Sequence, residues 1–538
     1  MNPKNERIII ILGVAVAGWM LWFLTFSPEH SLPNDRIVEQ PKRDLKYPQM
    51  IVRSTDDASL SEDRAEGTTV GRKPFPKGAK PGERVYQFES AEALNQFLDE
   101  AKQRGITVLG VLDEFNAVRV SDSGYMPKGA EELFNYWVNM PHSPDEAAMQ
   151  TSGSVPFEGE ALASLGIDQV DPTWGSGVRI AVLDTGVSEH PSLAEAKVER
   201  KQVENVTLGD GVDDNGHGTA AISIIAGNDD YVQGLAPAAE IMSYKILDEY
   251  GKGDTFSLSA AILDAIASGV DVISISAGSL SNDILLQQAV LLAATRGIPI
   301  IAGGGNNGTY LAQYPAAYST VIGVGSIDKN GLRSSYSNMG SVSIVAPSDS
   351  YSGWINGEHA LFYGTSASTL FVTATIAAVM SQNTFMSASD AAALVLKNTN
   401  EAGPAGDDDF FGKGLLDTAR AFRSNQPGFV DAGVATPFVL ASRGGNDGNA
   451  EIVFSIQNQG TVFLPNAHLD IELDGQKYTY PTMGLQKGES KSVSISIALD
   501  SITAENPTNI KVKARLDDSA EDMDSSNNEI TIRLEPKP

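Results

Sequence analysis

The sequence predicts an α/β protein with a central parallel sheet flanked by helices, preceded by a small α+β unit and followed by an all-β sandwich. Between residues 152 and 425, short apolar runs such as VRIAVLD and DVISIS alternate with helical stretches such as FSLSAAILDAIAS. Strands that are apolar on both faces and are joined by helices form parallel sheets. After residue 430 only strand-like runs recur, spaced by turn residues, which is typical of two packed antiparallel sheets.

The composition limits the class of protein. A chain of 538 residues exceeds what one compact core holds, so about three domains with connections are expected. The 68 acidic and 39 basic residues give a net charge of -29, which repels phosphate backbones and argues against nucleic acid as a partner. The chain has no cysteine, which excludes disulfides, thiolate metal sites and cysteine nucleophiles.

An apolar run near the N-terminus predicts a transmembrane signal anchor over residues 1–27. Lys4 and Arg7 precede an uncharged run over residues 8–26 that would span about 28 Å as a helix, enough to cross a bilayer. A cleaved signal peptide has a shorter apolar run and small residues at its cleavage site, so it is the less favoured alternative. Positive residues stay on the cytoplasmic side, which places the rest of the chain in a periplasm or the extracellular space.

Two further segments precede the central sheet. Residues 28–82 are polar and rich in proline and charge, without periodicity, which predicts a flexible tether. Residues 83–151 mix strand-like runs with a helix that Ser90 would cap and Gly105 would end, and AEELFNYWVNM suggests a second helix. This α+β unit is small for an independent core, so we expect it to lean on the central domain, residues 152–425.

Asp184 is the first candidate for chemistry. It directly follows the strand VRIAVL, and ligands of parallel sheets bind beyond the carboxyl ends of the strands. Aspartic proteases carry the same DTG triplet in a pair of carboxylates that share a proton. The similar triplet DSG at Asp122 lies too near in the sequence for two separate lobes, so the aspartic protease interpretation is disfavoured.

His217 stands out among the six histidines, which lie at positions 30, 142, 190, 217, 359 and 468. It occurs in DDNGHGTAAISIIAG, where glycines on both sides leave room for a substrate backbone and a helix begins at once. A histidine in such a place can act as a general base. Its position after the Asp184 strand makes catalysis a better interpretation than a purely structural one.

Ser366 and Asn306 complete the polar candidates. Ser366 lies where a loop enters a long helix, whose N-terminus offers unpaired N–H groups and a partial positive charge to an oxyanion. Taken alone, the small residues of GTSAS suit close helix packing equally well. Asn306 follows the strand and glycines of IIAGGG, and because no Lys-Ser or Lys-Thr pair comes after them, these glycines do not form a phosphate-binding loop.

Asp184, His217 and Ser366 occur in the chain order of subtilisins. The sequence around them resembles subtilases over residues 154–423. The matching stretches are IAVLDTGV, NGHGT, GLAPAAEI, DVISIS, AGGGNNGT, YPAAY, YGTSAS and GKGLLDTARA. The resemblance implies a serine endopeptidase that works through an acyl-enzyme, with Ser366 as nucleophile, His217 as general base and then acid, and Asp184 orienting the imidazole. It also implies that Asn306 forms an oxyanion hole with the backbone N–H of Ser366. No cofactor is required for this chemistry.

The resemblance also assigns the substrate cleft. Two edge segments would hold an extended peptide by strand-like hydrogen bonds, which read its backbone more than its side chains. The glycines of AGGGNNG would leave room in the S1 pocket for a large apolar residue. The residues so assigned are Gly251 and Gly253, Ser276, Ala277 and Gly278, and Gly303, Gly304 and Gly305.

Residues 83–151 resemble a subtilisin propeptide, an intramolecular chaperone and inhibitor. SVPF at residues 154–157 resembles the start of mature subtilases, so self-cleavage is expected near residue 151, between Gln150 and Gly153. The expected partners are therefore protein or peptide substrates, the chain's own propeptide and, through the N-terminal helix, the membrane. Because the anchor precedes the propeptide, cleavage would release the enzyme from the membrane unless the propeptide stays bound.

The sequence departs from the family near two of these motifs. Thr369-Leu370-Phe371 replaces the usual Ser-Pro-His after the nucleophile, and Ala220 replaces the usual second histidine. The segment AGNDDYVQG is too short for the calcium loop that commonly follows the histidine helix. No metal site is therefore predicted, and structural calcium lacks a clear motif.

The C-terminal region, residues 430–538, predicts an immunoglobulin-like sandwich and resembles the CARDB modules of bacterial surface proteins through DSSNNEITI. Its acidic run DDSAEDMDSSNNE is interpreted as a solvated hairpin loop in preference to a calcium site. The sandwich supports one alternative function, that of a catalytically inactive subtilase scaffold or adhesion protein. The complete set of catalytic residues favours the enzyme.

Overall fold

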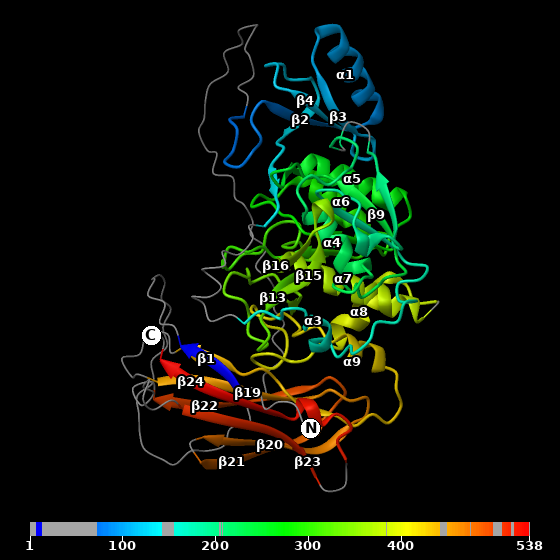
Figure 1. Ribbon diagram of the computed structural model, residues 1–538. Helices are drawn as coiled ribbons and strands as arrows, with labels where there is room; N and C mark the ends of the chain where they lie inside the picture. Colours follow the sequence, from blue (N-terminus) through cyan, green and yellow to red (C-terminus); the bar gives the residue numbers. More distant parts are fainter. Residues whose placement is uncertain are drawn as a thin grey trace, which may run out of the picture.

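Three units follow one another along the molecule (Figure 1). The small α+β unit lies at one end, the α/β unit in the middle and the all-β unit at the other end. The computed structural model describes residues 7–12, 73–141, 155–203, 206, 208–383, 385–441, 449–473, 475–498, 508–517 and 521–536. The fold class predicted from the sequence is confirmed for these residues.

The small unit is a four-stranded antiparallel sheet of order β3-β4-β2-β5 with one helix packed on it. Its elements are β2 (Glu83–Phe88), α1 (Ala91–Arg104), β3 (Val108–Leu112), a 3-10 helix (Asp113–Phe115), β4 (Ala117–Ser121), β5 (Ala130–Leu133) and β6 (Trp137–Asn139). Helix α1 begins and ends as predicted. The Ser90 hydroxyl accepts a hydrogen bond from Ala93 N at 3.3 Å, and Gly105 adopts the left-handed φ of 68° that ends a helix.

The second helix predicted over AEELFNYWVNM is wrong. These residues contain strand β5, which pairs with β2, and strand β6, which pairs antiparallel with β10 (Lys252–Asp254) of the central unit. Leu133 and Val138 are buried in a core that the small unit shares with the central unit. Pairing with neighbouring strands therefore overrides the local helical preference, a tertiary effect that a sequence pattern does not contain.

The central unit is built on a seven-stranded parallel sheet of order β14-β13-β12-β11-β7-β9-β8. Its strands are β7 (Arg179–Asp184), β8 (Lys197–Lys201), β9 (Glu240–Lys245), β11 (Val272–Ile275), β12 (Ile300–Gly303), β13 (Ile322–Ile327) and β14 (Ile344–Pro347). Its helices are α3 (Ala161–Ser164), α4 (His217–Ala226), α5 (Thr255–Ala267), α6 (Ile284–Thr295), α7 (Thr365–Ser381), α8 (Ala388–Lys397) and α9 (Thr418–Arg423), with 3-10 turns at Pro191–Leu193 and Ile355–Gly357. A hairpin of β15 (Asp349–Gly353) and β16 (His359–Tyr363) precedes α7.

Two cores cover the two faces of this sheet. Along β7, Ile180 and Val182 belong to one core and Ala181 and Leu183 to the other, as the alternation of a strand requires. Helices α4 and α7 contribute to the first core, and α5 and α6 to the second. Helix α7 is buried along almost its whole length and packs against β11, β12, β13 and β14. The small residues of this helix thus have the packing role that their size suggests.

The C-terminal unit is a sandwich of two sheets around one apolar core. One sheet has the order β1-β24-β23-β20-β21, and in the other β19 pairs with β17, β18 and β22. The strands are β17 (Ala432–Val434), β18 (Phe438–Ala441), β19 (Asn449–Asn458), β20 (Leu464–Leu473), β21 (Gln476–Leu485), β22 (Ser490–Ala498), β23 (Thr508–Leu516) and β24 (Glu529–Pro536), with a 3-10 turn at Ser525–Asn527.

The N-terminal segment differs from its prediction where it is described. Arg7–Leu12 forms strand β1, which pairs in parallel with β24, and does not form the start of a helix. A run of isoleucines has high strand propensity, and β24 offers it an edge to pair with. Within the described ranges, no helix has the length and apolar character needed to cross a membrane. The rest of the predicted anchor, and the tether up to residue 72, lie outside the described residues.

Buried polar contacts join the sandwich to the central unit. Arg420 of α9 is 3% exposed, and its guanidinium donates to Gln457 Oε1 at 3.0 Å and to Asn458 O at 3.3 Å, both at the end of β19. The backbone N–H of Glu401 also donates to Gln457 Oε1, at 2.9 Å. The Glu401 carboxylate accepts from Gly406 N at 2.8 Å. Arg420 and Glu401 thus both lie in the interface between the two units.

Because Glu401 is buried at this interface, we predict that the thermal stability of the folded chain falls as pH rises. Burial raises the pKa of Glu401 from 4.5 to about 7. The folded chain therefore holds this proton more tightly than the unfolded chain, so its stabilising contribution is complete below about pH 4.5 and is lost as pH rises through about 7. We expect Glu401→Gln to flatten the loss of thermal stability between about pH 5 and 8 in scanning calorimetry. Glu451→Gln, on an exposed side chain of β19, is the control, and equal slopes in both variants would contradict the prediction.

Candidate active site

Asp184 is the last residue of β7, the strand between β9 and β11. Its carboxylate is 1% exposed, and Oδ1 accepts a hydrogen bond from Thr185 N at 2.8 Å. Oδ2 is buried and receives no hydrogen bond from the described residues. The Asp184 carboxylate therefore lies at the carboxyl end of a central strand, which is where reactive groups are expected in a parallel sheet.

His217 is the first residue of α4, and the preceding loop holds it in place. Asp213 accepts hydrogen bonds from Gly216 N at 2.9 Å and Thr219 N at 2.8 Å, which supplies the acceptor that a helix start needs. The Thr185 hydroxyl, next to Asp184, donates to the same Asp213 carboxylate at 2.9 Å. The start of α4 is therefore fixed relative to the end of β7.

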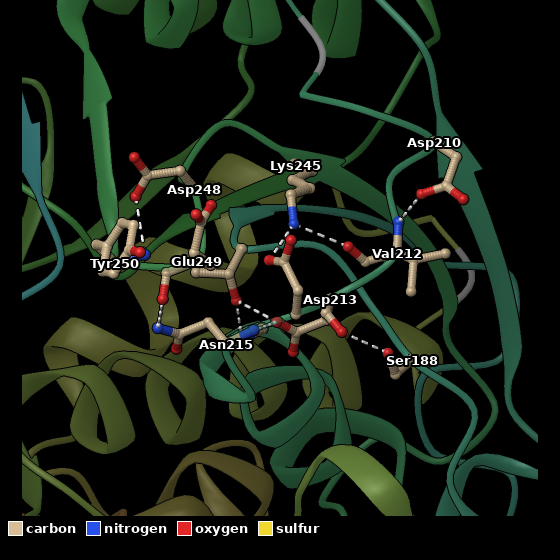
Figure 2. Close-up of polar contacts among 12 residues, drawn as sticks. Ser188, Asp210, Val212, Asp213, Asn215, Lys245, Asp248, Glu249 and Tyr250 are labelled. Atoms are coloured by element: carbon tan, nitrogen blue, oxygen red, sulfur yellow. Dashed lines mark hydrogen bonds and ion pairs between the residues drawn. The ribbon is translucent and has the colours of Figure 1, made fainter.

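The same loop is also tied to the end of β9 (Figure 2). Lys245, the last residue of β9, donates to Val212 O at 2.8 Å and forms an ion pair with Asp214. Asn215 Nδ2 donates to Glu249 O at 2.9 Å. These contacts to the ends of β7 and β9 leave the loop little freedom. The imidazole of His217, which follows the loop, therefore has a defined position.

The three side chains Asp184, His217 and Ser366 form a continuous hydrogen-bonded chain. His217 Nδ1 lies 2.7 Å from Asp184 Oδ1, and His217 Nε2 lies 3.2 Å from Ser366 Oγ. The imidazole is 5% exposed, and the Phe362 ring packs edge-on against it with ring centres 4.7 Å apart. The imidazole is thus held between a carboxylate and a hydroxyl, which is the arrangement that allows a histidine to take the proton of an attacking serine.

Ser366 lies in the first turn of α7, beside Asn306. Asn306 Oδ1 accepts hydrogen bonds from Thr365 N at 3.0 Å and Thr365 Oγ1 at 2.9 Å, which fixes the orientation of the amide. A Cβ on Gly364 would lie 2.4 Å from Asn306 Nδ2, and Gly364 has a φ of 102°, so the close approach requires glycine. An amide nitrogen and the N-terminal N–H groups of α7 therefore meet next to the serine.

A strand of the small unit occupies the predicted cleft. Asn139 N donates to Gly278 O and Gly278 N donates to Asn139 O, both at 2.9 Å, while Met140 N donates to Gly251 O at 2.8 Å. Strand β6 pairs on one side with β10, which contains Gly253, and on the other side with the segment after β11. The two predicted edge segments are therefore brought to either side of one extended chain. A Cβ on Gly251 would lie 2.9 Å from that of Met140, so a side chain here would hinder the approach.

The glycines predicted to line an S1 pocket are packed against protein atoms. A Cβ on Gly303 would lie 3.2 Å from Thr365 Oγ1, and a Cβ on Gly305 would lie 2.5 Å from Asn338 Nδ2. A Cβ on Gly304 would meet the carbonyl oxygen of residue 324 at 3.2 Å. Close packing is thus sufficient to explain the absence of side chains here, and the S1 assignment stays a prediction.

One group among the described residues has the donor atoms of a metal site. His190, Asp229 and His359 each place one ligand atom within 4.8 Å of the others. Both ring nitrogens of His190 are already engaged, Nδ1 with Ser192 Oγ and Nε2 with Glu358 O, each at 2.8 Å. His359 Nε2 lies 3.0 Å from Asp229 Oδ2. Because these contacts satisfy the group without an ion, it gives no support to a metal centre.

The acidic run near the C-terminus, described from residue 521, contacts the linker between the two large units. Asp522 Oδ2 accepts from Ala432 N at 3.0 Å, and Asp524 lies 3.5 Å from Arg423 Nη2. Asn527 Nδ2 donates to the buried Asp431 at 2.8 Å. The run is therefore more than a solvated hairpin, because it holds the start of the sandwich. The calcium alternative gains no support from these contacts.

Sequence reasoning missed three residues that position the catalytic groups. Asp213 orders the start of α4, Thr185 joins it to β7, and Thr365 orients Asn306. All three act through hydrogen bonds to other elements of the fold. The sequence holds only a weak indication of them, in the residues directly beside each motif, in DTG, DDNGHG and GTS.

Comparison with known proteins finds two families along the chain. The model described as "Subtilase family" matches residues 175–414, and the CARDB model matches residues 438–532. Subtilisin Savinase of Lederbergia lenta is 36% identical over 255 residues, covering 46% of this chain and 92% of the relative. M-protease of Shouchella clausii is 36% identical over 375 residues, covering 69% and 95%. Minor extracellular protease Epr of Bacillus subtilis is 33% identical over 258 residues, covering 46% and 40%.

Proposed function

The chain belongs to the subtilase family and is a serine endopeptidase, and we propose that Asp184, His217 and Ser366 are its catalytic triad. The single observation that carries this proposal is the hydrogen-bonded chain from the Asp184 carboxylate through the imidazole to the Ser366 hydroxyl. The family requires no cofactor for catalysis. An inactive scaffold is not favoured, because the three side chains are present and correctly spaced.

In the proposed reaction Ser366 Oγ attacks the substrate carbonyl carbon while its proton passes to Nε2 of His217. The oxyanion that forms is stabilised by the backbone N–H of Ser366 and the Asn306 amide. The imidazolium gives its proton to the departing amine, which leaves an ester on Ser366. Water, deprotonated by His217, hydrolyses the ester and restores the hydroxyl. Asp184 stabilises the imidazolium in both halves of the reaction.

Covalent labelling with a serine-directed phosphonate tests this assignment. We expect the processed chain to be labelled at Ser366 and the Ser366→Ala variant to remain unlabelled. Ser368 supplies a matched control, because its hydroxyl lies two residues further along α7 and donates to Ala346 O and Pro347 O, away from the imidazole. Ser368→Ala should keep the label at Ser366. Absence of label in processed wild-type chain would support the scaffold instead.

We also propose that residues 83–151 form a propeptide that inhibits the peptidase of residues 152–425, with the sandwich over 430–538. The support is the occupation of the cleft by residues 138–140 of the small unit, in the manner of a bound peptide. Substrates would bind in the same extended form, with little selection by sequence. Large apolar residues are expected at P1, and faster cleavage after Ala than after Phe or Leu would contradict that preference.

For the site of action, we propose that the catalytic unit works outside the cytoplasm and that residues 1–27 anchor its precursor to the membrane, in a state in which Arg7–Leu12 is not paired with β24. The charges of Lys4 and Arg7, the apolar run after them and a relative named an extracellular protease support this proposal. Cleavage near residue 151 would then also release the enzyme. Recovery of all mature enzyme in washed membranes, with an intact N-terminus, would rule out release.

A further inference from the structure

A proline ends the strand that fills the cleft. We propose that Pro141 is a specificity-determining residue of self-cleavage: it allows residues 137–141 to occupy the cleft without being cut, so that self-cleavage uses a bond elsewhere. The inference rests on the proposed propeptide function and deepens it, because it names the residue that excludes one bond.

The hydrogen bonds of the strand fix which residue faces the nucleophile. Asn139 and Gly278 exchange two backbone hydrogen bonds of 2.9 Å, and in an antiparallel ladder such a pair recurs two residues further along each strand. Continued by two residues in this register, the strand would place Pro141 opposite Ser276. The Ser276 hydroxyl lies 3.5 Å from the carbonyl oxygen of Ser366. A strand that continued in this register would present the carbonyl group of Pro141 to Ser366.

Proline cannot complete this ladder. A substrate residue opposite Ser276 would donate its N–H to the Ser276 carbonyl, and Pro141 has no N–H. Its ring also holds φ near -65°, away from the extended value of an antiparallel strand. The carbonyl carbon is therefore not held in the position that attack requires.

Neither bond of Pro141 is well suited to cleavage. Cutting the 141–142 bond would transfer the Pro141 acyl group to Ser366 Oγ, release the amine of His142, and use one water to free the Pro141 carboxylate. That step lacks the positioning hydrogen bond. A shift by one residue would offer the Met140–Pro141 bond, whose nitrogen carries the ring that crowds the preceding residue. The chain is thus resistant in both registers.

Other contacts hold the uncut strand firmly. Val138 is fully buried in the core that the small and central units share. Asp254, the last residue of β10, accepts from Arg119 at 2.9 Å and from Lys80 at 3.0 Å, both residues of the small unit. These charges are mostly buried and paired, so the strand leaves the cleft only when the unit moves with it. Cleavage elsewhere in the same molecule therefore requires the strand to leave first.

The first test compares the full wild-type chain with Pro141→Ala by N-terminal sequencing of the fragments over time. We expect a fragment beginning at His142 in the variant, formed at least about tenfold faster than in the wild type, because alanine restores the N–H. The double variant Pro141→Ala, Ser366→Ala should give no such fragment. Pro144→Ala is the matched control and should leave the wild-type pattern unchanged. A wild-type fragment that begins at His142 and forms as fast as in Pro141→Ala, or an unchanged pattern in Pro141→Ala, would overturn the proposal.

A second test does not depend on folding of the variant chain. The synthetic peptides WVNMPHS and WVNMAHS are offered to the processed enzyme, and we expect the first to inhibit and remain intact while the second is cut between Ala and His. Equal cleavage of both would overturn the proposal.

A third variant separates an error in the role of Pro141 from an error in the proposed peptidase function. Val138→Asp should expel the strand from the cleft, since a buried valine becomes a charge. If this chain hydrolyses an external peptide while Pro141→Ala is not cut after residue 141, the role of Pro141 is wrong and the peptidase stands. If the central unit of this chain keeps its cooperative thermal unfolding and yet hydrolyses nothing, the proposed function is wrong.

Discussion

His217→Ala is expected to lower kcat for a peptide substrate about a millionfold, with KM little changed. In subtilisin, loss of the corresponding histidine or serine costs about two-millionfold, and that measured value is the basis for the magnitude here. The physical reason is that, among the described residues, the imidazole at 3.2 Å is the base recorded as hydrogen-bonded to the Ser366 hydroxyl. Steady-state kinetics on the processed enzyme measures the effect, and self-cleavage of the full chain should be lost as well.

His359→Ala is the matched control for this variant. His359 lies on β16, in the hairpin before the helix of the nucleophile, and its ring contacts Asp229 rather than Asp184. We expect its kcat to stay within about twofold of the wild type, because surface ion pairs contribute little. If the two variants lost activity to the same extent, the assignment of His217 as the base would be wrong.

Asp184→Asn is expected to lower kcat about ten-thousandfold while the fold is retained. The carboxylate accepts the Nδ1–H of His217 at 2.7 Å, which leaves Nε2 unprotonated and able to take the serine proton. An asparagine amide could present a donor to Nδ1, which would place the imidazole proton on Nε2 and stop it from acting as a base. The change also removes the negative charge that stabilises the imidazolium.

The control for this prediction is Asp210→Asn. Asp210 is exposed and accepts from Val212 N at 3.0 Å in the loop before His217, so it tests whether loss of any carboxylate near the site is enough. Its activity should be close to that of the wild type, and thermal unfolding of both variants should show similar midpoints. A loss of less than about tenfold in Asp184→Asn would mean that the carboxylate does not set the imidazole tautomer.

The sequence predicted most where reactive residue types occur inside local secondary-structure signals. Asp184, His217 and Ser366 each lie at the end of a strand or the start of a helix, in a short motif rich in glycine and other small residues. The structure brings the three side chains within hydrogen-bonding distance. Ser90 and Gly105 bound α1 as predicted, because a cap depends on residues adjacent in the chain. Such features are local, and a sequence displays them directly.

Predictions failed where partners come from elsewhere in the chain. Residues 130–133 and 137–139 form strands because β2 and β10 offer them edges, and Arg7–Leu12 forms a strand on β24. The packing of the glycines at 303–305 against Thr365 and Asn338 is likewise not visible in the sequence, and their S1 assignment stays a prediction. Asp213 likewise joins two separate elements, the end of β7 and the start of α4, through hydrogen bonds.

By itself, the sequence determined the fold class, the family pattern and the residues able to attack, accept a proton and stabilise charge, because these depend on residue type and on period along the chain. Only the tertiary structure decided that residues 137–140 lie in the predicted cleft and that Asn139 is the residue opposite Gly278. Register between distant strands is set by the hydrogen bonds and buried side chains of both partners together, so neither segment specifies it alone.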